Sequence, residues 1–94
     1  MIKLGMKPVN ALKIGDIISP RFNIEKARVM HWMYANECAL NISPLGTQST
    51  LEIFEICTTP GAPWVKVYLP HTHNTQSLKL SGSELSSLFL FVQC

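Results

Sequence analysis

Residues 50–69 read TLEIFEICTTPGAPWVKVYL, and this stretch decides the fold class. Its two ends are rich in β-branched and aromatic residues, which favour β-strands. Between the ends, residues 58–63 combine two prolines with a glycine and two threonines, a composition typical of a turn. The sequence therefore predicts two strands, separated by a turn.

Residues 64–69 alternate regularly between aliphatic side chains and larger amphipathic ones. Because successive side chains of a strand point to opposite sides, Val65, Val67 and Leu69 are predicted to face the core. The opposite face is predicted to carry two aromatic rings and a cation, Trp64, Tyr68 and Lys66.

Residues 51–57 form the second predicted strand, but their alternation is not strict. Glu55 and Cys57 fall on the same face as Leu51 and Ile53, although glutamate is rarely buried. A strand covered on both sides, or a single β-bulge, would explain this pattern.

Turn formers divide the rest of the chain into short pieces as well. Ile17 and Ile18 are expected to form a strand after a bend at Gly15, and SLKL at 77–80 another. Residues 81–89, SGSELSSLF, predict a short helix that is capped by Ser81 or Ser83 and runs into a terminal strand.

Residues 24–35 allow two interpretations. A helix capped by Asn23 is one. The other is a hairpin that pairs residues 28–34 with 37–43, and we expect the hairpin because Lys26, Arg28 and His31 scatter around a helical wheel.

These elements predict a mainly β fold, all-β or α+β. It would be a small barrel or a curled antiparallel sheet of five to six strands with one short C-terminal helix. The 94 residues indicate a single domain, 1–94, with residues 1–5 as a candidate for a loose N-terminal extension.

Composition narrows the function classes. Apolar residues make up 47% of the chain and charged residues 15%, which argues against disorder and favours association, with a homodimer expected. No apolar run is long enough for a membrane span, and three cysteines without a pairing pattern argue against a disulfide framework. A cytoplasmic location and no membrane contact are the expectations.

The leading site hypothesis is an aromatic sheet face that binds a protein partner or a second copy of the chain. Tryptophan and tyrosine are the residue types that dominate protein–protein hot spots. The predicted face consists of Trp32, Tyr34, Trp64 and Tyr68.

A nucleic-acid-binding barrel is the alternative, because residues 1–30 carry a local excess of positive charge that suits phosphate groups. Its candidate contacts are Lys7, Lys13, Arg21, Lys26 and Arg28.

A metal-dependent enzyme is the third hypothesis. His71 and His73 in PHTHN would share one side of a strand, but no further ligand stands at a recognisable spacing, so no metal is expected. No nucleophile motif or phosphate-binding glycine loop occurs. We therefore expect a small intracellular binding module without enzymatic activity or cofactor, of the kind found as accessory proteins of phages and mobile elements.

Overall fold

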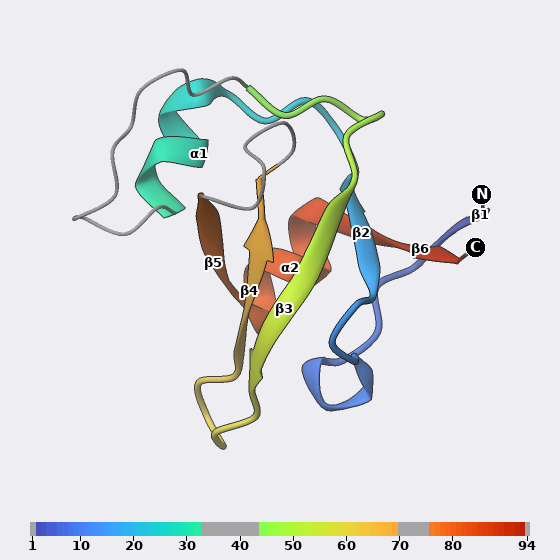
Figure 1. Ribbon diagram of the computed structural model, residues 1–94, viewed down its shortest axis with the longest axis vertical. Helices are drawn as coiled ribbons and strands as arrows, with labels where there is room; N and C mark the ends of the chain where they lie inside the picture. The colour runs from blue at the N-terminus through green and yellow to red at the C-terminus, as the bar shows by residue number, and fades with distance from the viewer. Residues whose placement is uncertain (1, 33–43, 70–75, 94) are drawn as a thin grey trace.

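The computed structural model describes residues 2–32, 44–69 and 76–93. In these ranges six antiparallel strands form one sheet in the order β1-β6-β2-β3-β4-β5 (Figure 1). Because β1 and β5 are its two edges, the sheet is curled and not closed into a barrel, and the mainly β prediction is confirmed in this form. The strands are β1 (Ile2–Leu4), β2 (Ile17–Pro20), β3 (Leu51–Cys57), β4 (Trp64–Tyr68), β5 (Ser77–Ser81) and β6 (Phe89–Gln93).

The predicted C-terminal helix is confirmed as α2 (Gly82–Leu88), which leads directly from β5 into β6. Ser81 is the N-cap, and its hydroxyl accepts a hydrogen bond from the Glu84 backbone N–H. A helical turn of 3-10 type, η1 (Val9–Ala11), precedes β2. In the described part of the chain, no helix is both long and apolar enough to cross a membrane.

The hairpin expected at residues 28–34 and 37–43 is wrong for its first half, because Lys26–Trp32 form the helix α1. Residues 33–43 lie outside the described residues. Val29 and Trp32, one helical turn apart, are the two buried side chains of α1. Two apolar contacts with the core are enough to orient this short helix, and a helical wheel does not display so narrow a stripe.

The segment considered as a loose N-terminal extension contains a strand. β1 pairs with β6 in an antiparallel register in which Ile2, Lys3 and Leu4 stand opposite Gln93, Val92 and Phe91. All three side chains of β1 are exposed. Pairing of the backbone holds this strand, so its sequence lacks the alternation that marks a half-buried strand.

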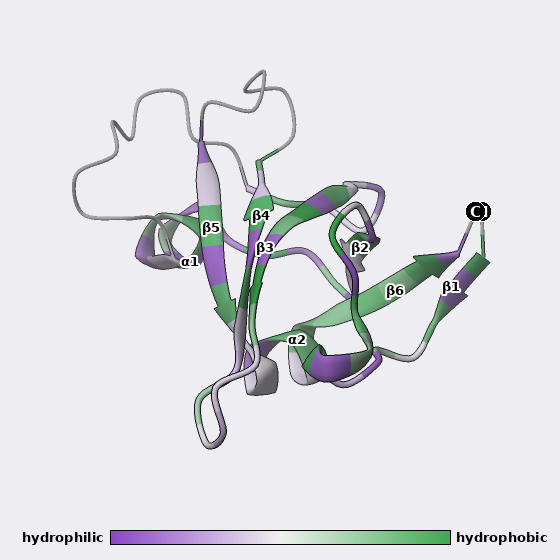
Figure 2. Cartoon of the chain, turned by 60° about the horizontal axis from the view of Figure 1, so that its bottom comes forward, coloured by the Kyte–Doolittle hydropathy of each residue, from purple (hydrophilic) through white to green (hydrophobic). Residues whose placement is uncertain are grey.

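The core lies on the concave side of the sheet and is covered by the two helices (Figure 2). The predicted inward face of the β4 region is confirmed, since Val65, Val67 and Leu69 are all buried. Phe89 at the start of β6 is fully buried, and its ring centroid lies 5.9 Å from that of Trp32. Phe89 therefore joins α1 to the sheet.

The irregular alternation of β3 comes from a bulge, the second of the two explanations offered by the sequence. Ile53 pairs with Val67, but Glu55 pairs with Lys66, so one extra residue of β3 lies between these pairs. That residue is Phe54. A bulge of this kind lets two successive side chains of one strand serve the same side of a sheet.

The turn between β3 and β4 matches its prediction. Gly61 has φ +85°, a left-handed backbone conformation that glycine adopts without steric cost. The Ala62 backbone N–H donates to the carbonyl of Thr59 at 3.1 Å and closes the turn.

Candidate partner-binding face

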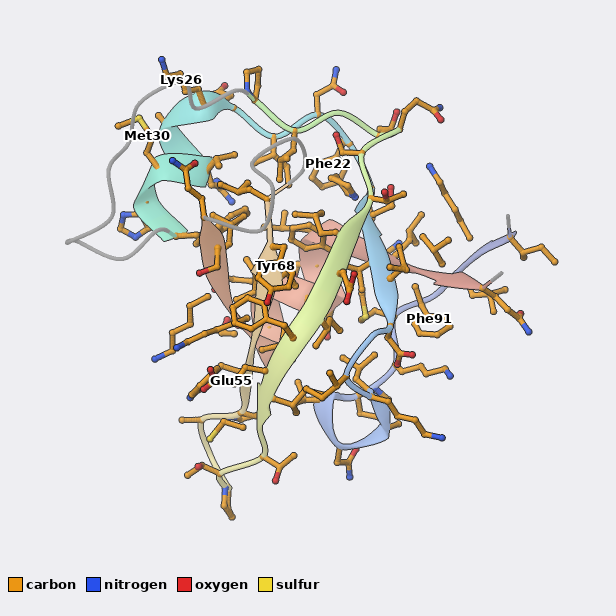
Figure 3. The ribbon with its side chains drawn as sticks, in the orientation of Figure 1. Phe22, Lys26, Met30, Glu55, Tyr68 and Phe91 are labelled. Carbon is orange, nitrogen blue, oxygen red and sulfur yellow. The ribbon has the colours of Figure 1, made fainter. Side chains whose placement is uncertain are left out.

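The convex side of β3, β4 and β5 carries a mixed group of aromatic and charged side chains, which we call the outer face. Opposed residues of an antiparallel pair point to the same side, so the pairs Cys57–Trp64, Glu55–Lys66 and Lys66–Lys79 share this side. Figure 3 shows Glu55 and Tyr68 on the side of the sheet away from α2. The outer face consists of Phe54, Glu55, Cys57, Trp64, Lys66, Tyr68 and Lys79.

Two rings of the outer face form a stacked pair. Phe54 and Tyr68 have ring centroids 4.1 Å apart and ring planes inclined by 16°. Both side chains are half-buried. The bulge in β3 brings Glu55 to the same side as Phe54, because strict alternation from Ile53 would place Glu55 on the core side.

The third ring, Trp64, lies close to two cations. The Lys66 and Lys79 ammonium groups are 5.4 and 4.6 Å from its ring centroid. These lysines stand directly opposite each other, an arrangement of like charges that costs free energy. The Trp64 ring and a salt bridge of 3.4 Å between Glu55 and Lys66 offset that cost.

Lys79 differs from Lys66 in its electrostatic surroundings. Its side chain is exposed and has no carboxylate partner in the described part of the chain. Among the described residues, the outer face therefore holds one lysine in a salt bridge and one lysine without a carboxylate partner.

Cys57 borders the same cluster, and its thiol is free. Hydrogen bonds from the hydroxyl and the backbone of Thr59 lower the pKa of this thiol, with a smaller contribution from the charge of Lys79. The Cys57 Sγ and Thr59 Oγ1 atoms are 2.9 Å apart. A lower pKa raises the thiolate fraction near neutral pH, and the thiolate is the nucleophile in alkylation.

Replacing Thr59 by valine is expected to slow the alkylation of Cys57 by iodoacetamide severalfold at pH 7.5. The variant loses the hydroxyl that stabilises the thiolate, so the pKa of Cys57 rises and less thiolate is present. Mass spectrometry of the peptide that contains Cys57 measures the rate. Thr58→Val is the matched control, and equal rates in the two variants would contradict the assignment.

The structure distributes the predicted aromatic set over two environments. Trp64 and Tyr68 lie on the outer face, as the alternation of residues 64–69 predicts. Trp32 is only 6% exposed and belongs to the core, so it is not part of the predicted aromatic face. Tyr34 lies outside the described residues. Phe54 and Lys79 belong to the face but were not predicted; the broken alternation of residues 51–57 was the available signal for Phe54.

The five basic residues of the nucleic-acid hypothesis are all exposed, but they do not converge. Lys26 and Arg28 lie in α1, while Lys7 and Lys13 flank η1 on the other side of the molecule (Figure 1). The Lys7 ammonium lies 4.1 Å from the ring centroid of Phe91 on β6. Arg21 directly follows β2. The basic residues of 1–30 therefore lie on separate parts of the surface and do not form one basic patch.

His71 and His73 lie outside the described residues, so the structure does not address this pair. Within the described ranges, no group of three or more histidine, cysteine, aspartate or glutamate side chains is arranged to hold a metal ion.

Comparisons with family models, curated proteins and solved structures find no match for this chain. Any functional assignment has to stand on the geometry of the outer face and on the chemistry of its residues.

Proposed function

We propose that the protein is a non-enzymatic binding module that contacts another protein through the outer face. The observation that carries this proposal is the set of three half-buried rings, Phe54, Trp64 and Tyr68, on a side of the sheet that neither α1 nor α2 covers. Aromatic side chains held in place by their neighbours offer large contact area at small entropic cost.

The ring contacts favour a protein over a single-stranded nucleic acid. Stacking of bases needs accessible ring faces. One face of Tyr68 is taken by Phe54, and the Lys79 ammonium lies over Trp64. The basic residues near the N-terminus also lie on separate parts of the surface, so they do not form the continuous positive groove that a nucleic acid backbone would follow.

Replacing Trp64 and Tyr68 together by serine is expected to weaken binding to the natural partner by tenfold or more. Loss of two aromatic anchors typically costs more than about 1 kcal/mol each, and about 1.4 kcal/mol corresponds to tenfold in affinity. Crosslinking in the source cells identifies the partner, and calorimetry with the purified partner gives the affinity.

The matched control replaces Phe22 and Met30 by serine, since both are large, exposed apolar side chains near α1 and away from the outer face (Figure 3). Thermal melts confirm that each variant remains folded. Equal loss of affinity in both double variants would contradict the proposal. So would a crosslink to the partner that disappears after nuclease treatment.

A further inference from the structure

The register of β4 and β5 determines which backbone groups of β5 point away from β4. The Leu69 N–H donates to the Gln76 carbonyl at 3.0 Å, and the Gly82 N–H donates to the Pro63 carbonyl at 3.1 Å. Because hydrogen-bonded and non-hydrogen-bonded pairs alternate along antiparallel strands, Lys79 occupies a non-hydrogen-bonded position between them. The N–H and C=O groups of Lys79 consequently point away from β4, toward the outer edge of β5.

No described strand lies beyond β5, so this edge can pair with an extended segment. The side chain of Lys79 lies at the same position of β5, and its ammonium is 4.6 Å from the ring centroid of Trp64. The neighbouring lysine, Lys66, already has the carboxylate of Glu55 at 3.4 Å. The edge therefore combines outward backbone groups, an aromatic ring and a cation that has no described carboxylate partner.

We propose that the partner of the outer face is an extended protein segment with acidic side chains, which pairs with β5 at Lys79. A carboxylate of this segment binds the Lys79 ammonium, and an apolar side chain packs against Trp64. This inference rests on the proposed function and specifies the chemistry of the partner.

A second copy of the chain fits this edge poorly. Pairing of β5 with a second β5 about a twofold axis near Lys79 brings two lysines close together in the dimer. A lysine on an edge strand is a common protection against pairing of identical edges. With an acidic segment, the same lysine attracts a carboxylate and does not face a second lysine.

The test uses three probes with the intact protein: a ten-residue peptide of alternating glutamate and valine, the same peptide with glutamine for glutamate, and a ten-nucleotide thymidine oligonucleotide. Nuclear magnetic resonance titrations follow the Lys79 amide and the Trp64 indole N–H. We expect the acidic peptide to shift both signals and to bind two- to fivefold more tightly per engaged carboxylate, roughly the strength of an exposed ion pair.

The variant Lys79→Gln is expected to reduce the affinity of the acidic peptide to about that of the glutamine peptide. Lys26→Gln, which removes an exposed lysine of α1, leaves that affinity unchanged. The preference for the acidic peptide also decreases between 50 and 300 mM salt, because exposed charge pairs are screened.

The possible failures are distinguishable. Equal binding of both peptides at Trp64 overturns the acidic partner and leaves the proposed function intact. Absence of shifts at Lys79 and Trp64 with millimolar acidic peptide overturns the inference, as does concentration-dependent self-association that shifts these signals without peptide. Tighter, salt-sensitive binding of the oligonucleotide at the same residues overturns both the inference and the proposed function.

Discussion

Replacing Phe89 by alanine is expected to destabilise the protein by about 3–5 kcal/mol, the usual cost of removing a buried phenylalanine ring. Phe89 is fully buried and contacts Trp32 of α1. Phe89 is also the C-cap of α2 and the first residue of β6, so the ring lies where both helices meet the sheet. Among the described residues, Phe89 is the largest fully buried side chain.

The melting temperature is the measurement. For a domain of this size each kcal/mol corresponds to about 4–8 °C, so the Phe89→Ala variant should melt roughly 12–40 °C lower. A typical domain is stable by only about 5–15 kcal/mol, and the variant will be partly unfolded if the protein is at the lower end of that range.

Phe22→Ala is the matched control, because the same ring is removed from a side chain that is 52% exposed. We expect this substitution to change the free energy of unfolding by no more than about 0.5 kcal/mol. Comparable melting temperatures for the two variants would contradict the described packing of α1 and α2 around Phe89.

The second large effect is expected for Glu84→Ala, at about 2–3 kcal/mol. The Glu84 side chain accepts the Ser81 backbone N–H at 2.9 Å, while Ser81 Oγ accepts the Glu84 N–H at 3.2 Å. This capping box satisfies two backbone N–H groups at the start of α2. The other carboxylate oxygen accepts the indole N–H of Trp32. Alanine removes the acceptor and leaves the part-buried indole N–H without it.

A double-mutant cycle separates the two roles of Glu84. Trp32→Phe keeps an aromatic ring next to Phe89 but removes the indole N–H. The coupling between Glu84→Ala and Trp32→Phe in denaturant unfolding should be at least about 0.5 kcal/mol, as expected for residues in direct contact. Additive effects would contradict the hydrogen bond, and Glu52→Ala on the exposed face of β3 serves as a control for the loss of a carboxylate.

These contacts also explain how such a short helix as α1 forms at all. An isolated helix of seven residues is unstable in water, because nucleation is costly and few hydrogen bonds follow. The burial of Val29 and the contacts of Trp32 with Phe89 and Glu84 supply the missing free energy. Phe89 and Glu84 lie more than fifty residues further along the chain, and Val29 packs into the core. No local sequence pattern therefore predicts the helix.

The parts of the fold that the sequence determined by itself are those with local physical causes. The alternation of residues 64–69 predicted the two sides of β4, and the serines of residues 81–83 followed by Glu84 predicted the start of α2, with Ser81 or Ser83 as its cap. The irregular pattern of residues 51–57 pointed to the bulge as one of two explanations.

Tertiary structure alone decided the features that depend on distant partners. β1 exists because β6 supplies its hydrogen bonds, and Trp32 is a core residue because α1 packs against Phe89. The candidate site divides in the same way. Alternation placed Trp64 and Tyr68 on one side of a strand, but only strand pairing brought Lys79 to Trp64 and turned its backbone groups away from β4. Sequence periodicity predicts the direction in which a side chain points, whereas strand register and packing determine which residues it contacts.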